Sequence, residues 1–391
     1  MTKKNINILG ATGSIGLTTL KIIEKDKKNF QIHTLVADRN LKKIIILIKK
    51  YKPKNFLIND KKIFELVKKK NKNKNVNIVN TYDKLINLKK KEYFTVAAIP
   101  GIAGLMPTIK FINLSKKILL ANKESVICGW NIIKKKAREK KVDLIPIDSE
   151  HFSIKYLIKN QKKNLIERIY LTASGGPFLN YSLSKFKNIT PLQAIKHPKW
   201  NMGKKISIDS STMMNKILEL IEAQKLFSFP LNKFSIVIHP ESLVHAIIKY
   251  KNGITTFLYH EPDMVIPISN AIYNSNFDIN NLPKNSIYQK KIFNKKLNFY
   301  RPDVRKYPSL KLIPYLDKYP STSIIINAAN EILVDQFLCK KITFKAITTC
   351  LFAVLKDKNY KKYAIKIPNT LKKIYDIDEW GRSATLKILK K

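Results

Sequence analysis

The chain has 391 residues, of which 45% are hydrophobic, so it can fill two or three domains of roughly 100–200 residues. Its longest apolar stretches, such as residues 44–48, fall far short of the roughly 20 residues of a membrane span. Met1 and a pair of lysines lead directly into an apolar segment, which leaves no room for a signal peptide. The three widely spaced cysteines predict neither a disulfide framework nor a zinc site. We therefore expect a cytoplasmic protein that does not span a membrane.

The formal net charge of +46, from 74 Lys and Arg against 28 Asp and Glu, raises the alternative of a nucleic-acid-binding protein. The lysines, however, are spread over every region, mostly beside Asn and Ile, and form no single cluster interleaved with aromatic residues. This distribution favours solvated lysine-rich faces, typical of AT-rich codon usage, over a nucleic-acid surface. We expect no nucleic-acid partner.

The N-terminal region alternates between strand and helix patterns. Residues 6–9 predict a buried strand, residues 17–23 a helix and residues 32–37 a second strand, which together have the size of one βαβ unit. Further short apolar runs, separated by helical or lysine-rich stretches, lie at residues 56–58, 77–79, 95–99, 117–120 and 144–147. This alternation predicts an α/β fold whose N-terminal domain, residues 1–148, is doubly wound and Rossmann-like.

The remainder of the chain predicts a different architecture. Strand patterns occur at residues 169–173, 234–238, 243–249 and 253–258, so we expect a central α+β catalytic domain over residues 149–273. A capping Thr190, followed by Pro191 and Gln193, predicts a helix start. Residues 274–308, rich in Asn, Lys, Ser and Pro, predict a linker, and residues 309–391 a C-terminal helical domain.

A glycine-rich turn, Gly10-Ala-Thr-Gly-Ser-Ile-Gly16, separates the first predicted strand from the first helix. Glycines at such a turn let the backbone approach a pyrophosphate, which the helix N-terminus then binds. Asp38 follows the second strand, where an acidic residue usually holds the ribose of NAD, but the adjacent Arg39 suits a 2′-phosphate. The residues alone leave NAD and NADP open.

Carboxylates indicate a metal site. Asp148 and Glu150 follow a predicted strand, and alternate residues of an extended segment point the same way. In the segment 209–219, a cap-forming cluster precedes a helix on which Asn215, Lys216 and Glu219 share one broad face. Three oxygen ligands, Asp148, Glu150 and Glu219, suit Mg²⁺ or Mn²⁺. The alternative is an ordinary amphipathic helix with exposed polar residues.

Two loops complete the predicted site. Ser174-Gly-Gly-Pro177 follows a strand and has the composition of a backbone phosphate nest, although it also fits an ordinary turn. The segment His197–Gly203, which contains Trp200 and Met202, has the composition of a lid over a bound ligand.

Taken together, these segments resemble the 1-deoxy-D-xylulose 5-phosphate reductoisomerase family almost from end to end. The resemblance rests on the order and spacing of GATGSIG at 10–16, LLANKES at 119–125, PIDSEH at 146–151, TASGGPF at 172–178, HPKWNMGKKISIDSSTMMNK at 197–216, EPDM at 261–264 and NAANE at 327–331.

The resemblance implies a rearrangement of 1-deoxy-D-xylulose 5-phosphate, by retro-aldol and aldol steps, and its reduction by NADPH to 2-C-methyl-D-erythritol 4-phosphate in non-mevalonate isoprenoid biosynthesis. It implies one Mg²⁺ or Mn²⁺ per subunit, held by Asp148, Glu150 and Glu219, with Lys123 beside the reacting oxygen. It also implies a homodimer. The implied substrate contacts are Lys123, Ser149, Glu150, Ser174, His197, Trp200, Met202, Ser210, Asn215, Lys216 and Glu219. The implied NADPH contacts are Thr12, Gly13, Ser14, Ile15, Asp38, Arg39, Asn40, Asn122, Glu124 and Gly203.

Four positions depart from the family's usual pattern, and none of them removes a proposed ligand. Asp38 stands where Gly is common, Ser211 replaces Ala, Glu241 replaces Gln and His260 replaces Gly. The carboxylate of Asp38 would weaken binding of the 2′-phosphate, but Arg39 is retained and the resemblance still implies NADPH. The glycine-rich turn by itself also fits another NAD(P)-dependent enzyme, such as a semialdehyde or hydroxy-acid dehydrogenase that needs no metal.

Overall fold

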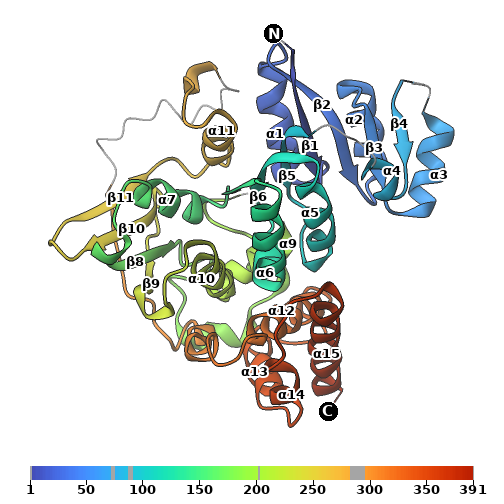
Figure 1. Cartoon of the computed structure of the whole chain (residues 1–391). Coiled ribbons are helices and arrows are strands. Elements are labelled where there is room, and N and C mark those ends of the chain that lie inside the picture. The colour runs from blue at the N-terminus through green and yellow to red at the C-terminus, as the bar shows by residue number, and fades with distance from the viewer. Residues whose placement is uncertain (1, 72–74, 87–90, 201–202, 282–295, 391) are drawn as a thin grey trace. The chain divides into compact units, whose positions relative to one another are not determined.

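The computed structural model describes residues 2–71, 75–86, 91–200, 203–281 and 296–390. The chain forms two compact units, and neither is continuous in sequence (Figure 1). The first unit comprises residues 1–125, 132–148 and 264–289, and the second comprises residues 126–131, 149–263 and 290–391. The chain thus leaves the first unit after Asp148 and returns to it at Met264.

The first unit contains a parallel seven-stranded sheet in the order β4-β3-β2-β1-β5-β6-β7. Its strands are β1 (Lys4–Leu9), β2 (Phe30–Ala37), β3 (Asn55–Ile58), β4 (Asn77–Val79), β5 (Glu92–Ala97), β6 (Ser115–Leu120) and β7 (Asp143–Pro146). Its helices are α1 (Ser14–Lys25), α2 (Leu41–Tyr51), α3 (Lys61–Lys70), α4 (Asp83–Ile86), η1 (Ile102–Gly104), α5 (Leu105–Ile112), α11 (Val265–Tyr273), η5 (Ile279–Asn281) and the two ends of α6 (Lys123–Glu139). The predicted doubly wound fold is confirmed, and the strand order reverses between β1 and β5, the place where such sheets bind ligands.

Apolar side chains on both faces of the strands build the core of this unit, as parallel sheets require. Ile6 and Ile8 of β1 pack in one cluster with Leu20 of α1 and with Ile268 of α11. Lys117 of β6 is a buried exception. Its ammonium donates to the carbonyl oxygens of Ala271 and Ile272 at 2.9 and 3.1 Å, so it caps the C-terminus of α11.

The second unit contains a mixed four-stranded sheet in the order β11-β10-β8-β9, in which only β8 and β9 are parallel. Its strands are β8 (Ile166–Ala173), β9 (Phe234–Ile238), β10 (Val244–Tyr250) and β11 (Thr255–Tyr259). Its helices are α7 (Ser149–Ile158), η2 (Lys163–Leu165), η3 (Leu183–Asn188), α8 (Pro191–Ala194), α9 (Lys204–Ser211), α10 (Met214–Phe227), η4 (Leu231–Lys233), η7 (Pro308–Tyr315), α12 (Thr322–Leu338), α13 (Phe344–Leu355), α14 (Tyr360–Ala364) and α15 (Leu371–Leu389). The helix start expected at Thr190 is confirmed, with both hydrogen bonds of its capping box.

The predicted linker, residues 274–308, includes residues 282–295, which lie outside the described residues. Its last residues belong to the second unit. Tyr300 forms a β-bridge with Ile238, and the fully buried Tyr307 donates its hydroxyl hydrogen to the carbonyl oxygen of Gly175 at 2.7 Å. Within the described part of the chain, no helix is both long and apolar enough to cross a membrane.

Candidate active site

The glycine-rich turn joins β1 to the N-terminus of α1, at the carboxyl edge of the seven-stranded sheet. Gly10 has a φ of +85°, and a Cβ added there would lie 2.5 Å from the carbonyl oxygen of Ala98. A Cβ on Gly16 would lie 2.5 Å from the carbonyl oxygen of Gly10. Both positions therefore require glycine, and the turn brings Thr12 to Ile15 to the start of the helix, where backbone N–H groups favour anions.

The predicted ribose-binding residues follow β2 at the same edge. Asp38 and Arg39 form an exposed ion pair with 3.4 Å between the nitrogen and the oxygen. The side chain of Asn40 caps α2 by accepting a hydrogen bond from the backbone N–H of Lys43 at 3.0 Å. The Lys43 ammonium in turn donates to the carbonyl oxygen of Thr12 at 3.2 Å, which ties this loop to the glycine-rich turn.

Asn122, Lys123 and Glu124 follow β6, and all three are buried. The Asn122 side chain accepts the backbone N–H of Ser125 at 2.5 Å and donates to the carbonyl oxygen of Gly101 at 2.9 Å, so it caps α6 and fixes the loop after β5. The Lys123 ammonium lies 3.3 Å from Oδ2 of Asp148. The residues predicted after β1, β2, β6 and β7 thus share one edge of the sheet.

Asp148, Glu150 and Glu219 form one carboxylate group, since each offers an oxygen that lies within 4.8 Å of the others. Asp148 and Glu150 do not lie on an extended segment, so the prediction that their carboxylates converge by strand alternation is wrong. Asp148 is the last residue before α7, and Glu150 lies in its first turn. A helix start brings the two carboxylates together as well as an extended strand would.

Glu219 lies on α10, a helix that is buried along most of its length. The Lys216 ammonium forms ion pairs with Glu219, at 2.5 Å, and with Glu150, while the Asn215 amide donates to Glu219. The predicted sharing of one face by these residues is therefore confirmed. The cap-forming role of residues 209–212 is wrong: Asp209, Ser210 and Ser211 belong to α9, and α10 follows Met213, which has a φ of +66° and provides no side-chain cap.

The second predicted anion pocket is organised around Ser174 and His197. Nδ1 of His197 accepts the backbone N–H of Trp200 at 2.9 Å, so Nε2 carries the hydrogen and donates to Oγ of Ser174 at 2.9 Å. Burial and the nearby charge of Lys216 lower the pKa of His197 to about 4, which keeps this tautomer neutral at physiological pH. Because Ser174 Oγ also accepts the N–H of Gly176, its own hydrogen is left to donate.

The turn after Ser174 lies against Ser210 and Ser211, at the end of α9. Gly176 has a φ of +65°, and a Cβ there would lie 3.0 Å from the carbonyl oxygen of Ser210. Gly203 is exposed and precedes α9. Met202, a predicted substrate contact, lies outside the described residues.

Two buried residues behind the carboxylates escaped the sequence interpretation. His151 and Glu222 are 0% and 1% exposed, with 3.5 Å between Nδ1 and Oε2. Nε2 of His151 donates to the carbonyl oxygen of Glu219 at 2.9 Å, so the imidazole braces the backbone of a predicted ligand. The signal was available: His151 follows Glu150, and Glu222 lies one helical turn beyond Glu219.

The donor set fits a hard divalent cation. Three carboxylates within reach of one another, without a thiol or imidazole among them, match the oxygen ligands that Mg²⁺ and Mn²⁺ prefer. The single ammonium of Lys216 pairs with two of these carboxylates, Glu150 and Glu219, so it balances only one of their two negative charges.

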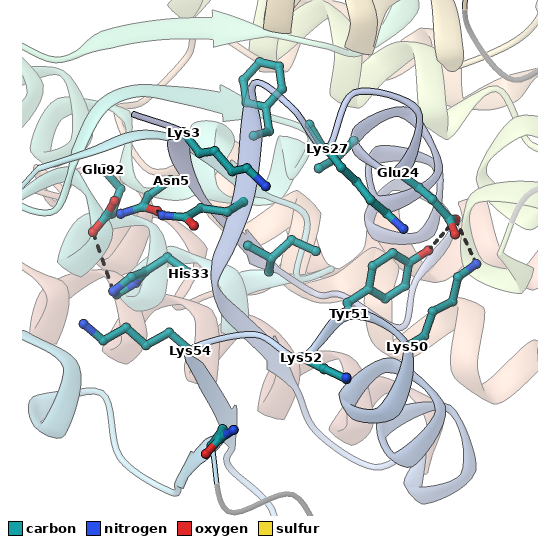
Figure 2. A pocket seen from close by; sticks show the side chains of 15 residues that line it. Lys3, Asn5, Glu24, Lys27, His33, Lys50, Tyr51, Lys52, Lys54 and Glu92 are labelled. Carbon is teal, nitrogen blue, oxygen red and sulfur yellow. Dashed lines mark hydrogen bonds and ion pairs between the residues drawn. The ribbon is translucent and has the colours of Figure 1, made fainter. Parts of the chain in front are cut away.

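A cavity of about 810 Å³ lies at the opposite, amino-terminal edge of the seven-stranded sheet (Figure 2). Figure 2 shows Glu24 held by Lys50 and Tyr51, and His33 beside Glu92, with four further lysines around the hollow. Burial and the charge of Lys54 lower the pKa of His33 to about 4. None of the predicted site residues lines this cavity, and lysines at helix C-termini are ordinary partners of the helix dipole.

Comparison with known proteins identifies relatives of the whole chain. The model of the 1-deoxy-D-xylulose 5-phosphate reductoisomerase family matches residues 6–129, and models of C-terminal domains of that enzyme match residues 144–227 and 260–384. The chain is 42% identical to the 1-deoxy-D-xylulose 5-phosphate reductoisomerase of Pelagibacter ubique, with 96% of this chain and 97% of the relative covered. It is 39% identical to that of Wolbachia pipientis wMel, covering 99% and 98%.

Solved structures give the same result. A crystal structure of DOX-P reductoisomerase in complex with NADPH, fosmidomycin and magnesium matches with a TM-score of 0.90 at 33% identity, covering 99% of this chain and 98% of that one. The Zymomonas mobilis 1-deoxy-D-xylulose 5-phosphate reductoisomerase in complex with NADPH matches with a TM-score of 0.87, at 33% identity over the full length of both chains.

Proposed function

Because the chain belongs to the 1-deoxy-D-xylulose 5-phosphate reductoisomerase family, we propose that it converts 1-deoxy-D-xylulose 5-phosphate to 2-C-methyl-D-erythritol 4-phosphate with NADPH and a divalent cation. The observation that carries this proposal is the group of Asp148, Glu150 and Glu219, with Lys216 beside it. A related structure that matches the whole chain contains NADPH, fosmidomycin and magnesium together.

The three carboxylates hold Mg²⁺ or Mn²⁺ in this proposal. When bound, the cation polarises the carbonyl and the neighbouring hydroxyl of the substrate as a Lewis acid. Lys123, whose ammonium lies 3.3 Å from Asp148, stabilises the negative charge that develops on the substrate oxygen. Ser149 and Glu150, at the start of α7, contact the carbon backbone of the sugar phosphate.

The phosphate is bound by donors from two segments of the second unit. Ser174 offers its hydroxyl hydrogen, since its oxygen already accepts from His197 and Gly176. Ser210, Asn215 and Lys216 lie on the helices that follow and add further donors. His197 lies close to the phosphate as a neutral imidazole that holds Ser174, and Trp200 and Met202 cover the substrate in this proposal.

NADPH binds at the carboxyl edge of the seven-stranded sheet, with its pyrophosphate at the start of α1 and Arg39 on the 2′-phosphate. The other proposed contacts are Asp38, Asn40, Asn122, Glu124 and Gly203. The proposed division is an NADPH-binding domain at residues 1–148, a catalytic domain at 149–273, a linker at 274–308 and a helical domain at 309–391. It differs from the two compact units in that residues 264–273 belong to the first unit. A homodimer and a cytoplasmic location stay predictions.

The deciding experiment is an NADPH oxidation assay in which the metal is removed by a chelator and then restored. We expect turnover only when 1-deoxy-D-xylulose 5-phosphate and Mg²⁺ or Mn²⁺ are both present. An enzyme that shows no turnover under these conditions, or full turnover in chelator, would refute the proposal. The second outcome would favour a metal-independent dehydrogenase.

A further inference from the structure

Strand β10 carries one extra residue at His245. Val244 lies opposite Tyr259 and Ala246 lies opposite Leu258, so three residues of β10 face two of β11. Such a bulge redirects a side chain and often occurs beside an active site. The side chain concerned here is the buried imidazole of His245.

A second histidine holds this imidazole in place. The ring of His260, which follows β11, stacks on the ring of His245 with 3.9 Å between centroids and 15° between planes. Nε2 of His245 lies 3.2 Å from the carbonyl oxygen of His260 and therefore carries the hydrogen, because a carbonyl only accepts. The orientation of His245 is thus set by the face of His260 and by its backbone.

The flat ring of His260, not its charge, makes the contact with His245. Its Nδ1 donates to the carbonyl oxygen of Glu261 at 2.8 Å, and its Nε2 is buried without a hydrogen-bond partner in the described part of the chain. Burial lowers the pKa of His260 to about 4, so the ring is neutral at physiological pH. An imidazole that keeps a buried lone pair unsatisfied is costly. The contacts that the ring makes are the stacking on His245, an edge contact with Phe152 and the hydrogen bond to Glu261.

The other side of His245 meets the loop that carries predicted substrate contacts. The rings of His245 and Trp200 lie edge to face, with 6.1 Å between centroids and 71° between planes. The backbone N–H of Trp200 is bound by His197, which also holds Ser174. The chain of contacts thus runs from His260 through a single ring to Trp200 and on to the phosphate pocket.

We propose that His260 is a positioning residue for substrate binding: its ring holds the imidazole of His245 in the orientation against which Trp200 packs. This inference rests on the function proposed above, in which Trp200 covers the sugar phosphate. His260 does not touch the substrate, so its effect falls on KM more than on kcat.

Two substitutions separate the ring from its hydrogen bond. His260→Phe keeps a flat ring and loses the hydrogen that Nδ1 donates to Glu261, whereas His260→Asn keeps a donor near Nδ1 and loses the ring. We expect His260→Asn to raise KM for 1-deoxy-D-xylulose 5-phosphate about three- to tenfold, the range of an aromatic pair, with kcat within about twofold. His260→Phe should stay within about twofold of the wild type in both constants.

Fluorescence provides a readout that does not depend on turnover. In a background with Trp130→Phe and Trp380→Phe, Trp200 is the remaining tryptophan. His260→Asn should shift its emission, and His260→Phe should leave it close to the parent, with both variants checked for folding by thermal unfolding.

The proposal is overturned if both variants match the wild type in KM and in Trp200 emission, or if Phe is the more damaging change. The second result would assign the role to the hydrogen bond with Glu261. A wild-type enzyme without turnover would instead refute the proposed function, and the emission comparison would still decide whether His260 orders Trp200.

Discussion

The predicted sites of the two units are held by different kinds of interaction. At the edge of the seven-stranded sheet, the glycine-rich turn is shaped by backbone contacts, and the charged pair Asp38–Arg39 is exposed. In the second unit, Lys216 and Glu219 are buried on α10 and paired with one another. Charges interact far more strongly where water is excluded. The glycine-rich turn therefore depends mainly on the absence of side-chain atoms, and the carboxylate group depends mainly on buried charges. Three substitutions test this contrast.

The largest effect should follow Glu219→Gln, which removes one carboxylate and keeps the size of the side chain. Loss of an outer-shell partner already costs about 10–100-fold in metal affinity, so loss of a ligand should weaken Mn²⁺ binding at least about 100-fold and nearly abolish turnover. Titration with Mn²⁺ measures the metal affinity, and the NADPH oxidation assay measures the turnover.

Glu167→Gln is the matched control for this change. Glu167 pairs with Lys249 on the surface of β8, so the substitution removes the same charge away from the group. Turnover and Mn²⁺ affinity should equal those of the wild type. If Glu219→Gln retained wild-type Mn²⁺ affinity, its assignment as a ligand would be wrong.

An intermediate effect is expected from Gly16→Ala, because the added Cβ would lie 2.5 Å from the carbonyl oxygen of Gly10. The turn must shift to accommodate it, at a cost of about 1–3 kcal/mol. NADPH affinity should fall about tenfold, while Mn²⁺ affinity should not change, as measured by calorimetric titration of each ligand.

Gly253→Ala separates loss of stability from loss of the site. Gly253 has a φ of +87°, and a Cβ there would meet nothing within 4 Å, so alanine strains only its own turn. This variant should melt at a lower temperature and bind NADPH normally. Equal losses of NADPH affinity in both glycine variants would contradict the steric argument.

The smallest effect should follow Asp38→Asn, since this carboxylate is exposed and next to Arg39. An exposed charge contributes about 0.5–1 kcal/mol, so removing it should tighten NADPH binding about two- to fivefold. NADH binding should weaken or stay constant. Asp376→Asn, at an exposed position of α15, should leave both affinities unchanged. A variant that binds NADPH less tightly would show that Asp38 assists the cofactor.

Much of the fold follows from patterns in the sequence. The seven strands of the first unit occur where short apolar runs predict them, because strands covered on both faces must be apolar. The pattern does not reveal that α11 belongs to the first unit, because its place depends on contacts with residues more than 200 positions earlier, such as Leu20. Contacts of that kind leave no local periodicity.

The sequence predicts those parts of the site in which the residue type alone indicates the chemistry, as carboxylates indicate a metal site. Carboxylates suit hard cations whichever backbone conformation brings them together, so the predicted group of Asp148 and Glu150 is present although the two residues lie at a helix start. Spacing places His151 next to Glu150, but it does not show which atoms the rings of His151 and His260 face, and their roles depend on those atoms. The tautomer of His197 became clear only from its hydrogen bonds to Trp200 and Ser174.

The buried Lys117 has a consequence for biosynthesis. Its ammonium caps α11, which is translated long after the strands that it covers. At about 5–20 residues per second, a ribosome needs about 6–25 s to proceed from Asp148 to Tyr273. During that interval, the strands have been translated but the apolar side chains of α11 that pack in their core, such as Ile268, have not. The core of the first unit is therefore completed only when α11 has been translated.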